Sequence, residues 1–352
     1  MSTLKLIERR LKRGAKSLPT HGVRMALFHA KRAVGASTRS DRSFLVNELA
    51  RMLDAGLVGD GLYVMATGRV DGAGAQATAK MSAMALARHY GLTYVHTPFQ
   101  TMEHAENGSP ALWAAAWENI FNLGNGELSA DACGLPQVGI EEFIGNRLWW
   151  NKPCLLAAGH YARFTDSHPE AYARISEELR AKYRRTRTEH QAHREIVVCA
   201  HLRRGDVSAA DPDTANRAPD YVSFLNCLRQ VQGALAATGL AVRTKIISQG
   251  DARGLELLQA MGCELNLNTP AIDSFHQMVD ADVLVMGRSS FSFAAALLGE
   301  GLRIYDPCAR APVPGWLVRS PEGFVDGSAL AWGVTGIAAR LRAANKGLAR
   351  AG

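Results

Sequence analysis

No run of the roughly 18 apolar residues that a membrane-spanning helix requires occurs in this chain of 352 residues. The N-terminal residues also lack the apolar stretch and small-residue cleavage site of a secretory signal. These absences exclude the common integral-membrane and secreted classes. We therefore expect a protein of the cytoplasm.

The six cysteines are widely separated, with no C-x-x-C pair and no histidine spacing that would complete a tetrahedral zinc site. Such a distribution is typical of a reducing compartment rather than of a disulfide-bonded protein. Aromatic residues are also sparse, at 7%, and form no cluster with basic side chains. The chain therefore lacks the stacking surface that single-stranded nucleic acid requires, and no nucleic-acid partner is predicted.

Positive charge exceeds negative charge, giving a formal net charge of +7, and much of the excess lies within residues 1–20. On a helical wheel, the basic side chains of this segment gather on one side and its leucines and isoleucine on the other, and Pro19 would end the helix. Such a basic amphipathic segment suits peripheral contact with the inner face of an anionic membrane. A solvated helix packed on the protein is the alternative, and the sequence leaves both open.

Apolar runs of strand length alternate with helical stretches along the rest of the chain, which predicts parallel β-sheets covered by helices. The first half contains strands at 61–66, 92–96 and 154–158 and helices at 75–90 and 110–121. The second half contains strands at 196–202, 244–248, 263–267, 282–286 and 302–305, with helices at 221–237, 254–261, 273–279 and 291–298. This half is predicted to be a doubly wound domain, whose ligands bind at the carboxyl ends of the strands.

A polar and highly charged stretch at 168–195 is typical of an exposed helix that joins two domains. We therefore expect, after the basic segment, one α/β domain over 21–193 and a second over 194–352. A last helix near 328–350 is expected to pack back on the first domain.

One predicted strand of the second domain ends abruptly in polar residues, in the sequence Ile196-Val-Val-Cys-Ala-His201-Leu-Arg203-Arg204-Gly-Asp206. Two adjacent guanidinium groups match the oxygens of a diphosphate, and each charge-assisted hydrogen bond contributes about 1.5–3 kcal/mol. A surface cluster of salt bridges would have the same composition. The segment alone therefore leaves the phosphate interpretation and the structural one open.

A second strand end has the same character. The sequence Val283-Leu-Val-Met-Gly-Arg-Ser289-Ser290-Phe291-Ser predicts a buried strand followed by a serine-rich turn that opens an alanine-rich helix. Free N–H groups at a helix start bind phosphate readily, and the serine hydroxyls add donors. Helix capping is the alternative, because serine is a preferred N-cap residue. Two such strand ends in one domain favour a phosphate site.

These two segments resemble the GT-B fold fucosyltransferases that make α1,2-, α1,6- and protein O-linked fucose from GDP-fucose. The resemblance rests on the H-x-R-R-x-D strand end and the S-S-F-S helix start. It implies an α/β, GT-B-like fold of two Rossmann-type doubly wound domains facing a cleft. Domain 21–193 would then lie on the acceptor side, and domain 194–352 would bind the sugar nucleotide.

The resemblance also implies roles for individual residues. The first arginine of the motif would hold the donor diphosphate, the histidine would lie beside the nucleoside, and the serine-rich turn would bind phosphate. An aspartate at the position of Asp273 would lie in the nucleotide half of the site, although such a residue also suits a helix N-cap. The residues expected to bind the sugar nucleotide are His201, Arg203, Arg204, Asp206, Asp273, Ser289, Ser290 and Phe291.

A glycine-rich loop in the first half, from Gly68 to Gln76, is similar to the G-G-x-G-N-Q-type loop that the family places near the sugar and acceptor. It departs from that pattern at Ala75, where the family has asparagine. The resemblance assigns Gly72, Gly74 and Gln76 to this role. The same glycines fit the dinucleotide fingerprint of an NAD-dependent oxidoreductase, but no acidic residue for the ribose hydroxyl follows the next strand.

The predicted reaction is an inverting transfer of L-fucose to a glycan hydroxyl, in which Arg203 stabilises the leaving diphosphate and Asp211 acts as base. Asp211 is chosen because the α1,6 members carry a glutamate at the corresponding place. Asp206, Asp213 and the diphosphate itself are alternatives for the base. No metal and no other cofactor is predicted, because the family resembled needs none and D-x-D triplets arise by chance. The GDP-sugar is a co-substrate.

The expected setting is a bacterial enzyme of polysaccharide biosynthesis that acts on a glycan or a lipid-linked glycan, because the Golgi anchor usual in the family is absent. Three alternatives remain. The first is a transferase of the same fold with another nucleotide sugar. The second is an oxidoreductase, and the third is a non-catalytic protein that binds anionic surfaces.

Overall fold

The structure is a computed structural model that describes residues 39–351 except 104, 107, 188–194, 206, 208–209, 211–214 and 309. By their internal contacts these residues form two compact units. The first takes its described residues from the chain up to Gly68, from Ser82–Thr97 and from Glu127–His168. The second takes Arg69–Met81, Pro98–Gly126 and the described residues from Pro169 onwards. The basic segment 1–20 and the expected boundary at 193/194 lie outside the described residues.

A five-stranded parallel sheet forms the centre of the described first unit, in the order β3-β2-β1-β5-β4. Its longest strands are apolar and buried, and Met65, Val95 and Leu155 from three neighbouring strands form one core cluster. The helix α3 packs against α7 and α8. The bounds are α3 Arg39–Asp54, β1 Leu62–Ala66, β2 Thr93–His96, β3 Leu128–Ser129, α6 Ala130–Cys133, β4 Gln137–Gly139, α7 Ile140–Gly145, η1 Arg147–Trp149, β5 Cys154–Ala158 and α8 Ala162–Ser167.

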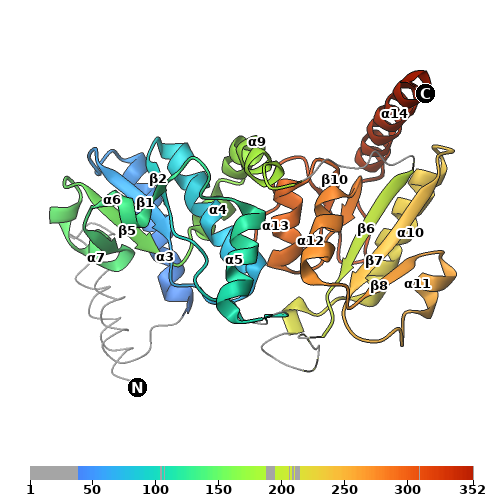
Figure 1. The fold of residues 1–352 in the computed structure, drawn as a ribbon, viewed down its shortest axis with the longest axis horizontal. Helices are drawn as coiled ribbons and strands as arrows, with labels where there is room; N and C mark the ends of the chain where they lie inside the picture. Colours follow the sequence, from blue (N-terminus) through green and yellow to red (C-terminus); the bar gives the residue numbers. More distant parts are fainter. Residues whose placement is uncertain are drawn as a thin grey trace, which may run out of the picture. The chain divides into compact units, whose positions relative to one another are not determined.

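A six-stranded parallel sheet forms the centre of the described second unit, in the order β11-β10-β9-β6-β7-β8 (Figure 1). Counted along the chain from β6, this is the 3-2-1-4-5-6 order of a Rossmann fold, and the direction of winding reverses between β6 and β9. The strand bounds are β6 Ile196–Leu202, β7 Val242–Ser248, β8 Glu264–Leu267, β9 Val283–Val285, β10 Leu302–Tyr305 and β11 Leu317–Val318.

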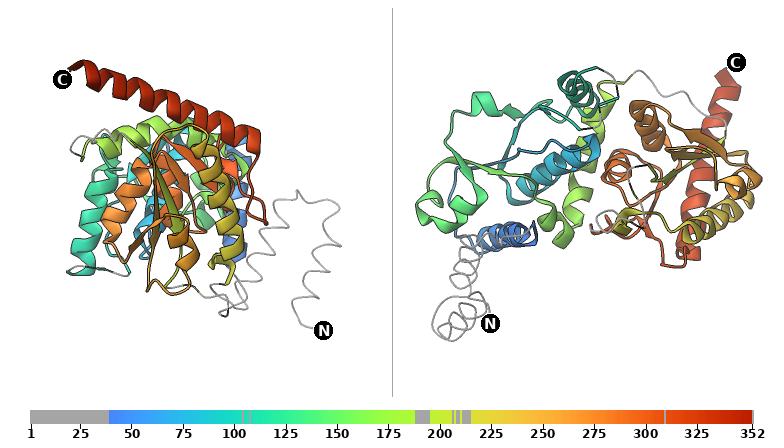
Figure 2. Two further views of the ribbon diagram at one scale, coloured as in Figure 1. Left: turned by 90° about the vertical axis from the view of Figure 1, so that its right-hand side faces the viewer. Right: turned by 90° about the horizontal axis from the view of Figure 1, so that it is seen from below.

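Helices cover both faces of this second sheet. Alternate residues of β6, such as Val198 and Ala200, pack against the apolar faces of α10, α11 and α14. On the other face the Cys199 thiol donates to the Gln277 carbonyl of α12 at 3.2 Å. The long α14 runs beside α10 (Figure 2). The bounds are η2 Ala215–Arg217, α10 Tyr221–Ala236, α11 Glu256–Ala260, α12 Ala271–Asp280, α13 Ser290–Leu298 and α14 Gly327–Ala351.

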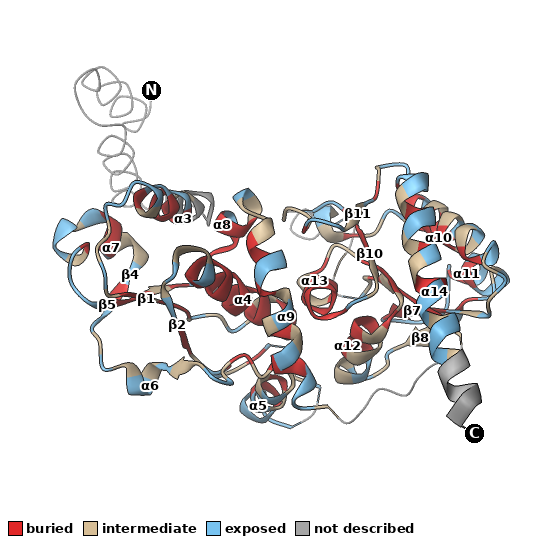
Figure 3. Cartoon of the chain, turned by 90° about the horizontal axis from the view of Figure 1, so that it is seen from above, coloured by how far each residue is buried: buried red, intermediate tan, exposed pale blue. Residues whose placement is uncertain are grey.

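Three further helices complete the second unit. Ser109 caps α5, Pro110–Phe121, whose first residue is a proline, as is common at a helix start. The helix α9, Glu170–Arg184, packs against α5 and α13. The helix α4, Ala73–Tyr90, belongs to this unit up to Met81. Both α4 and α13 are almost wholly buried (Figure 3).

The expected α/β fold with two doubly wound parallel sheets is confirmed. The last helix lies where the sequence predicts it, and within its own unit it packs against α10 and β6. That it packs on the first domain stays a prediction. Among the helices in the described part of the chain, none combines the length and the apolar character needed to span a membrane.

Candidate functional site

The carboxyl ends of β6 and β9 lie side by side where the strand order of the second sheet reverses. The strand β6 pairs in parallel with both β7 and β9, and its register with β9 joins Val198 to Val283. His201 stands at the end of β6, directly before the two arginines, and Ser289 stands in the turn after β9. Ligands of doubly wound sheets bind at this switch point.

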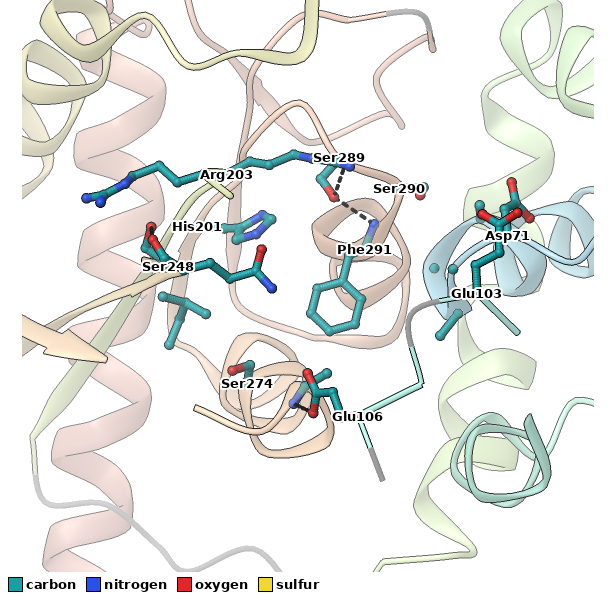
Figure 4. A pocket seen from close by; sticks show the side chains of 18 of the residues that line it. Asp71, Glu103, Glu106, His201, Arg203, Ser248, Ser274, Ser289, Ser290 and Phe291 are labelled. Carbon is teal, nitrogen blue, oxygen red and sulfur yellow. Dashed lines mark hydrogen bonds between the residues drawn. The ribbon is translucent and has the colours of Figure 1, made fainter. Parts of the chain in front are cut away.

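Arg203 and Ser289 are joined by a hydrogen bond across these two strand ends. Arg203 Nη1 donates to Ser289 Oγ at 3.2 Å, and the same oxygen accepts from the Phe291 backbone N–H at 3.2 Å (Figure 4). Ser289 is therefore the N-cap of α13, and it is 8% exposed. The Ser289 side chain can therefore cap α13 and contact the Arg203 guanidinium at the same time, because its oxygen accepts both hydrogen bonds.

His201 lies against the same turn. A Cβ at Gly287 would stand 2.7 Å from the His201 carbonyl oxygen and 3.2 Å from its Nδ1, so the turn approaches β6 only because residue 287 has no side chain. On the other side the His201 ring faces the Phe291 ring edge-on, with 6.2 Å between centroids. The end of β6 therefore packs directly against the turn that follows β9.

Arg204 points away from Ser289. Its Nη2 donates to the Asp251 carbonyl at 2.8 Å and stands 3.8 Å from the Asp251 carboxylate. Neighbouring side chains of an extended chain point in opposite directions, which accounts for this divergence from Arg203. Gly205 follows with a φ of 88°, and a Cβ there would stand 2.7 Å from Gln249 Oε1. The backbone turns sharply at this glycine, directly after the two arginines.

The start of α4 meets the start of α13 within the second unit. A Cβ at Gly74 would lie 2.5 Å from Phe291 Cα and 2.7 Å from the Ser290 carbonyl carbon, both backbone atoms. Neither helix carries an acidic side chain in its first turn. Two positive helix ends thus meet at the edge of the pocket, where an anion bound in the pocket would lie close to both. Because the space at Gly74 is filled by protein backbone, a dinucleotide pyrophosphate has no close approach there.

Gln76 stabilises the glycine-rich loop and does not line the pocket. Its Nε2 donates to the Asp71 carbonyl at 2.7 Å and to the Thr101 carbonyl at 2.9 Å, and the side chain is 3% exposed. It therefore ties the loop before α4 to the loop over residues 98–109. Gly72 and Gly74, by contrast, do line the pocket.

A pocket of about 410 Å³ opens at these strand ends, and all of its lining residues belong to the second unit. Its volume lies within the range of small-molecule sites. Its cationic and hydroxylic lining consists of Arg203, Arg204, Arg217, Ser248, Ser274, Ser289 and Ser290. Its apolar and acidic lining consists of Asp71, Met102, Glu103, Glu106, Trp113 and Trp117.

The two tryptophans belong to an aromatic cluster that fixes α5 to α12 and α13. The Trp117 ring packs edge-on against Phe275 and Phe291, with centroids 5.4 and 5.9 Å away, and against Trp113 at 5.8 Å. Such pairs contribute about 0.5–1.5 kcal/mol each beyond the burial of their surface. Trp117 is 1% exposed, and its indole N–H has no hydrogen-bond partner among the described residues.

Asp273 lies outside the pocket lining. It is exposed in the first turn of α12, whose N-cap is Pro270. The free N–H of Ala271 is satisfied by Glu106 instead, which accepts at 2.8 Å through Oε2. Asp273 therefore neither caps this helix nor faces the pocket.

A buried ion cluster supports the serine-rich turn from behind. Arg288 Nε donates to Asp306 Oδ1 at 3.2 Å, and Arg319 contacts the other oxygen of the same carboxylate. Asp306 is 3% exposed and Arg319 is 2% exposed. Arg288 is thus held by Asp306, and it does not line the pocket although it precedes Ser289.

Several residues that line the pocket belong to no motif or strand end that the sequence identifies. Trp113 and Trp117 stand four apart on α5, a spacing typical of an ordinary buried helix face. Glu103 and Glu106 lie in the loop between β2 and α5, too far beyond the strand end for the strand-end rule to mark them. Arg217 makes no ion pair or hydrogen bond with any described residue, so its charge is open to the pocket.

Three predicted residues, Asp206, Asp211 and Asp213, lie outside the described residues. Within the described part of the chain, no group of three or more His, Cys, Asp or Glu side chains is arranged to hold a metal ion. The metal-free reaction stays a prediction.

No protein-family model matches the sequence, and no curated protein matches it. Three solved structures match over 68% of this chain. They are the fucosyltransferase NodZ from Bradyrhizobium (94% of its chain, 11% identity, TM-score 0.39), its selenomethionine form (93%, 11%, 0.36) and a NodZ alpha-1,6-fucosyltransferase co-crystallised with GDP (93%, 12%, 0.34). Similarity of this degree transfers neither a substrate nor a residue role to this chain.

Proposed function

We propose that this chain is a glycosyltransferase that binds a nucleoside-diphosphate sugar in the pocket of its second unit and transfers the sugar with inversion. The observation that carries the proposal is the hydrogen bond between Arg203 and Ser289 at the switch point of a 3-2-1-4-5-6 sheet. A guanidinium and a capped helix start meet there, and both bind phosphate oxygens.

The charge distribution supports a diphosphate rather than a neutral ligand. Arg203, Arg204 and Arg217 line the pocket, and the starts of α4 and α13, which touch at Gly74, line it as well. Each charge-assisted hydrogen bond to such an anion contributes about 1.5–3 kcal/mol. Arg203 donates to the neutral hydroxyl of Ser289, and Arg217 forms no hydrogen bond or ion pair with any described residue, so its charge faces the pocket.

The apolar and acidic lining residues support transfer of a sugar rather than binding of a nucleotide alone. Aromatic rings pack well on the apolar faces of sugars, and carboxylates accept hydrogen bonds from sugar hydroxyls. Trp113, Glu103 and Asp71 supply these groups in the same pocket, and the close view shows Glu103 and Asp71 on the other side of Ser290 from Arg203 (Figure 4). As the glycosidic bond breaks, negative charge grows on the leaving diphosphate, which is where Arg203 and the serine-rich turn would stabilise it.

The finer assignment follows the sequence resemblance. The H-x-R-R strand end and the S-S-F-S helix start favour GDP-fucose as donor and a glycan or lipid-linked glycan hydroxyl as acceptor. We propose no metal, because Arg203 and two helix starts can compensate the diphosphate charge without one.

Calorimetric titration of the full chain with GDP, UDP and ADP tests the proposal, each in chelator and in Mg²⁺. We expect GDP to bind with micromolar affinity in both buffers and GDP-fucose to be consumed when an oligosaccharide acceptor mixture is added. Arg203→Ala, which removes the guanidinium, should weaken GDP binding and reduce transfer still more. Failure of every nucleoside diphosphate to bind would contradict the transferase, and binding only with Mg²⁺ would contradict the metal-free mechanism.

A further inference from the structure

Three carboxylates among the described residues line the pocket, and they all stand on loops rather than on the sheet. Asp71 precedes α4, while Glu103 and Glu106 lie in the loop between β2 and α5. An inverting transferase needs a group that takes the proton of the attacking hydroxyl, and a carboxylate is a common choice. The contacts of these three side chains separate them.

Asp71 and Glu106 are already engaged by the protein. Arg69 Nε donates to Asp71 Oδ1 at 3.0 Å, and Arg69 Nη2 contacts the other oxygen of the same carboxylate. Glu106 accepts from the Ala271 N–H at 2.8 Å, at the positive end of α12. Both carboxylates therefore already serve as hydrogen-bond acceptors for other parts of the second unit.

Glu103 differs from both. Its side chain is exposed and lines the pocket. Among the residues that the structure describes, none donates a hydrogen bond to its carboxylate or forms an ion pair with it. Its backbone is nevertheless fixed, because the Glu103 N–H donates to the Val70 carbonyl at 2.8 Å. Gln76 holds the same two loops together two residues away, through the carbonyls of Asp71 and Thr101. A free carboxylate is thus carried by an anchored segment.

The position of Glu103 suits attack from the face opposite the leaving group. In the close view, Glu103 lies on one side of the Ser289–Ser290 turn, while Arg203 and His201 lie on the other (Figure 4). A sugar whose diphosphate lies at Arg203 and Ser289 would extend towards Glu103. Its anomeric carbon would then stand between the two, as inversion requires.

We propose that Glu103 is the catalytic base that takes the proton of the acceptor hydroxyl; this rests on the proposed function. As the new bond forms between the acceptor oxygen and the anomeric carbon, the bond from that carbon to the diphosphate breaks. Its electron pair leaves with the diphosphate oxygen. The acceptor proton passes to the Glu103 carboxylate and from there to water, so charge and atoms balance.

The test compares Glu103→Gln with wild type in transfer rate, GDP affinity and pH dependence. We expect kcat to fall by about 10²–10⁴-fold, as is typical when a general base is lost. The Kd for GDP should stay within twofold, because Glu103 faces the sugar side. Asp60→Asn, an exposed carboxylate outside the pocket, serves as the matched control.

The pH profile separates a base from a structural residue. In wild type, log kcat/KM should fall with unit slope towards acid pH as the carboxylate is protonated, and Glu103→Gln should lack this limb. Glu106→Gln should lower stability and keep the limb. A Glu103→Gln enzyme with wild-type kcat would overturn the proposal, as would loss of the limb in Asp211→Asn while Glu103→Gln retains it. Wild type that binds no nucleotide would overturn the transferase itself.

Discussion

The Cβ position of Gly74 lies 2.5 Å from the Cα of Phe291, so the first turns of α4 and α13 touch backbone to backbone. A methyl group at residue 74 cannot be relieved by a rotamer change, because the atoms it meets are main-chain atoms. The contact therefore depends on glycine at this place. It also holds the serine-rich turn against the glycine-rich loop that precedes α4.

Gly74→Ala should separate the two helix starts, lower the unfolding free energy by about 1–3 kcal/mol and weaken GDP binding, because overpacking shifts backbone. Gly72→Ala is the control, since a Cβ there meets nothing within 4 Å and its stability should be unchanged. Denaturant unfolding and calorimetric titration measure both effects. Equal stability of the two variants would show that the contact is loose.

Arg203→Lys should fail almost as badly as Arg203→Ala, because a lysine offers a point charge without the planar fork that bridges phosphate and Ser289. The loss should be larger in kcat than in GDP affinity, since charge on the leaving phosphate grows towards the transition state. Arg204→Ala should be milder, because Arg204 is bonded to Asp251. Steady-state kinetics decide this, and wild-type kcat in Arg203→Lys would remove the central role of the guanidinium.

Ser289→Ala should cost about 1 kcal/mol in stability through loss of the cap and should also weaken donor binding through the freed Arg203. Adding Ser290→Ala should weaken binding further with little extra loss of stability, since the Ser290 hydroxyl does not cap the helix. Melting curves with and without GDP separate the effects. A fall in melting temperature with unaltered GDP affinity would make the turn structural only.

Because of Lys80, the free energy of unfolding should change with pH in the alkaline range. Burial lowers its pKa from 10.5 to about 8, against the opposing charge of Glu118, and the ammonium lies 5.2 Å from the centre of the Phe99 ring. Between these two pH values the unfolded chain binds the proton more strongly, so the unfolding free energy should rise with pH. Lys80→Met should lack this rise. If the unfolding free energies of wild type and Lys80→Met changed in parallel from pH 7 to 10, the prediction would be contradicted.

The strand-end rule predicted most of the cationic and hydroxylic lining. His201, Arg203, Ser289 and Ser290 were expected at two strand ends, and all of them line one pocket. The prediction works because parallel strands put their carboxyl ends at one edge, whichever order they take. The very short strands β3, β4 and β11 could not be predicted, since they lack the continuous apolar run that marks the equally short β9.

The apolar and acidic lining could not be predicted in the same way. Residues 69–81 and 98–126 join the second unit through tertiary packing, such as that of Trp117 on Phe275, which local sequence does not encode. The contact of Gly74 with Phe291 could not be predicted from the sequence either, because the two residues lie more than 200 positions apart and no local pattern links them. Whether Asp211 also reaches this site stays a prediction.

In the proposed transferase, the carboxylate of Asp306, shared between Arg288 and Arg319, bears on how the product leaves. A transferase must release its nucleoside diphosphate after every turnover, and each added cation at the phosphates would slow that dissociation. By holding Arg288, Asp306 keeps a guanidinium adjacent to Ser289 out of the pocket. Neutralising Asp306 would release this cation, and the consequence expected is a slower turnover limited by GDP escape rather than by glycosyl transfer.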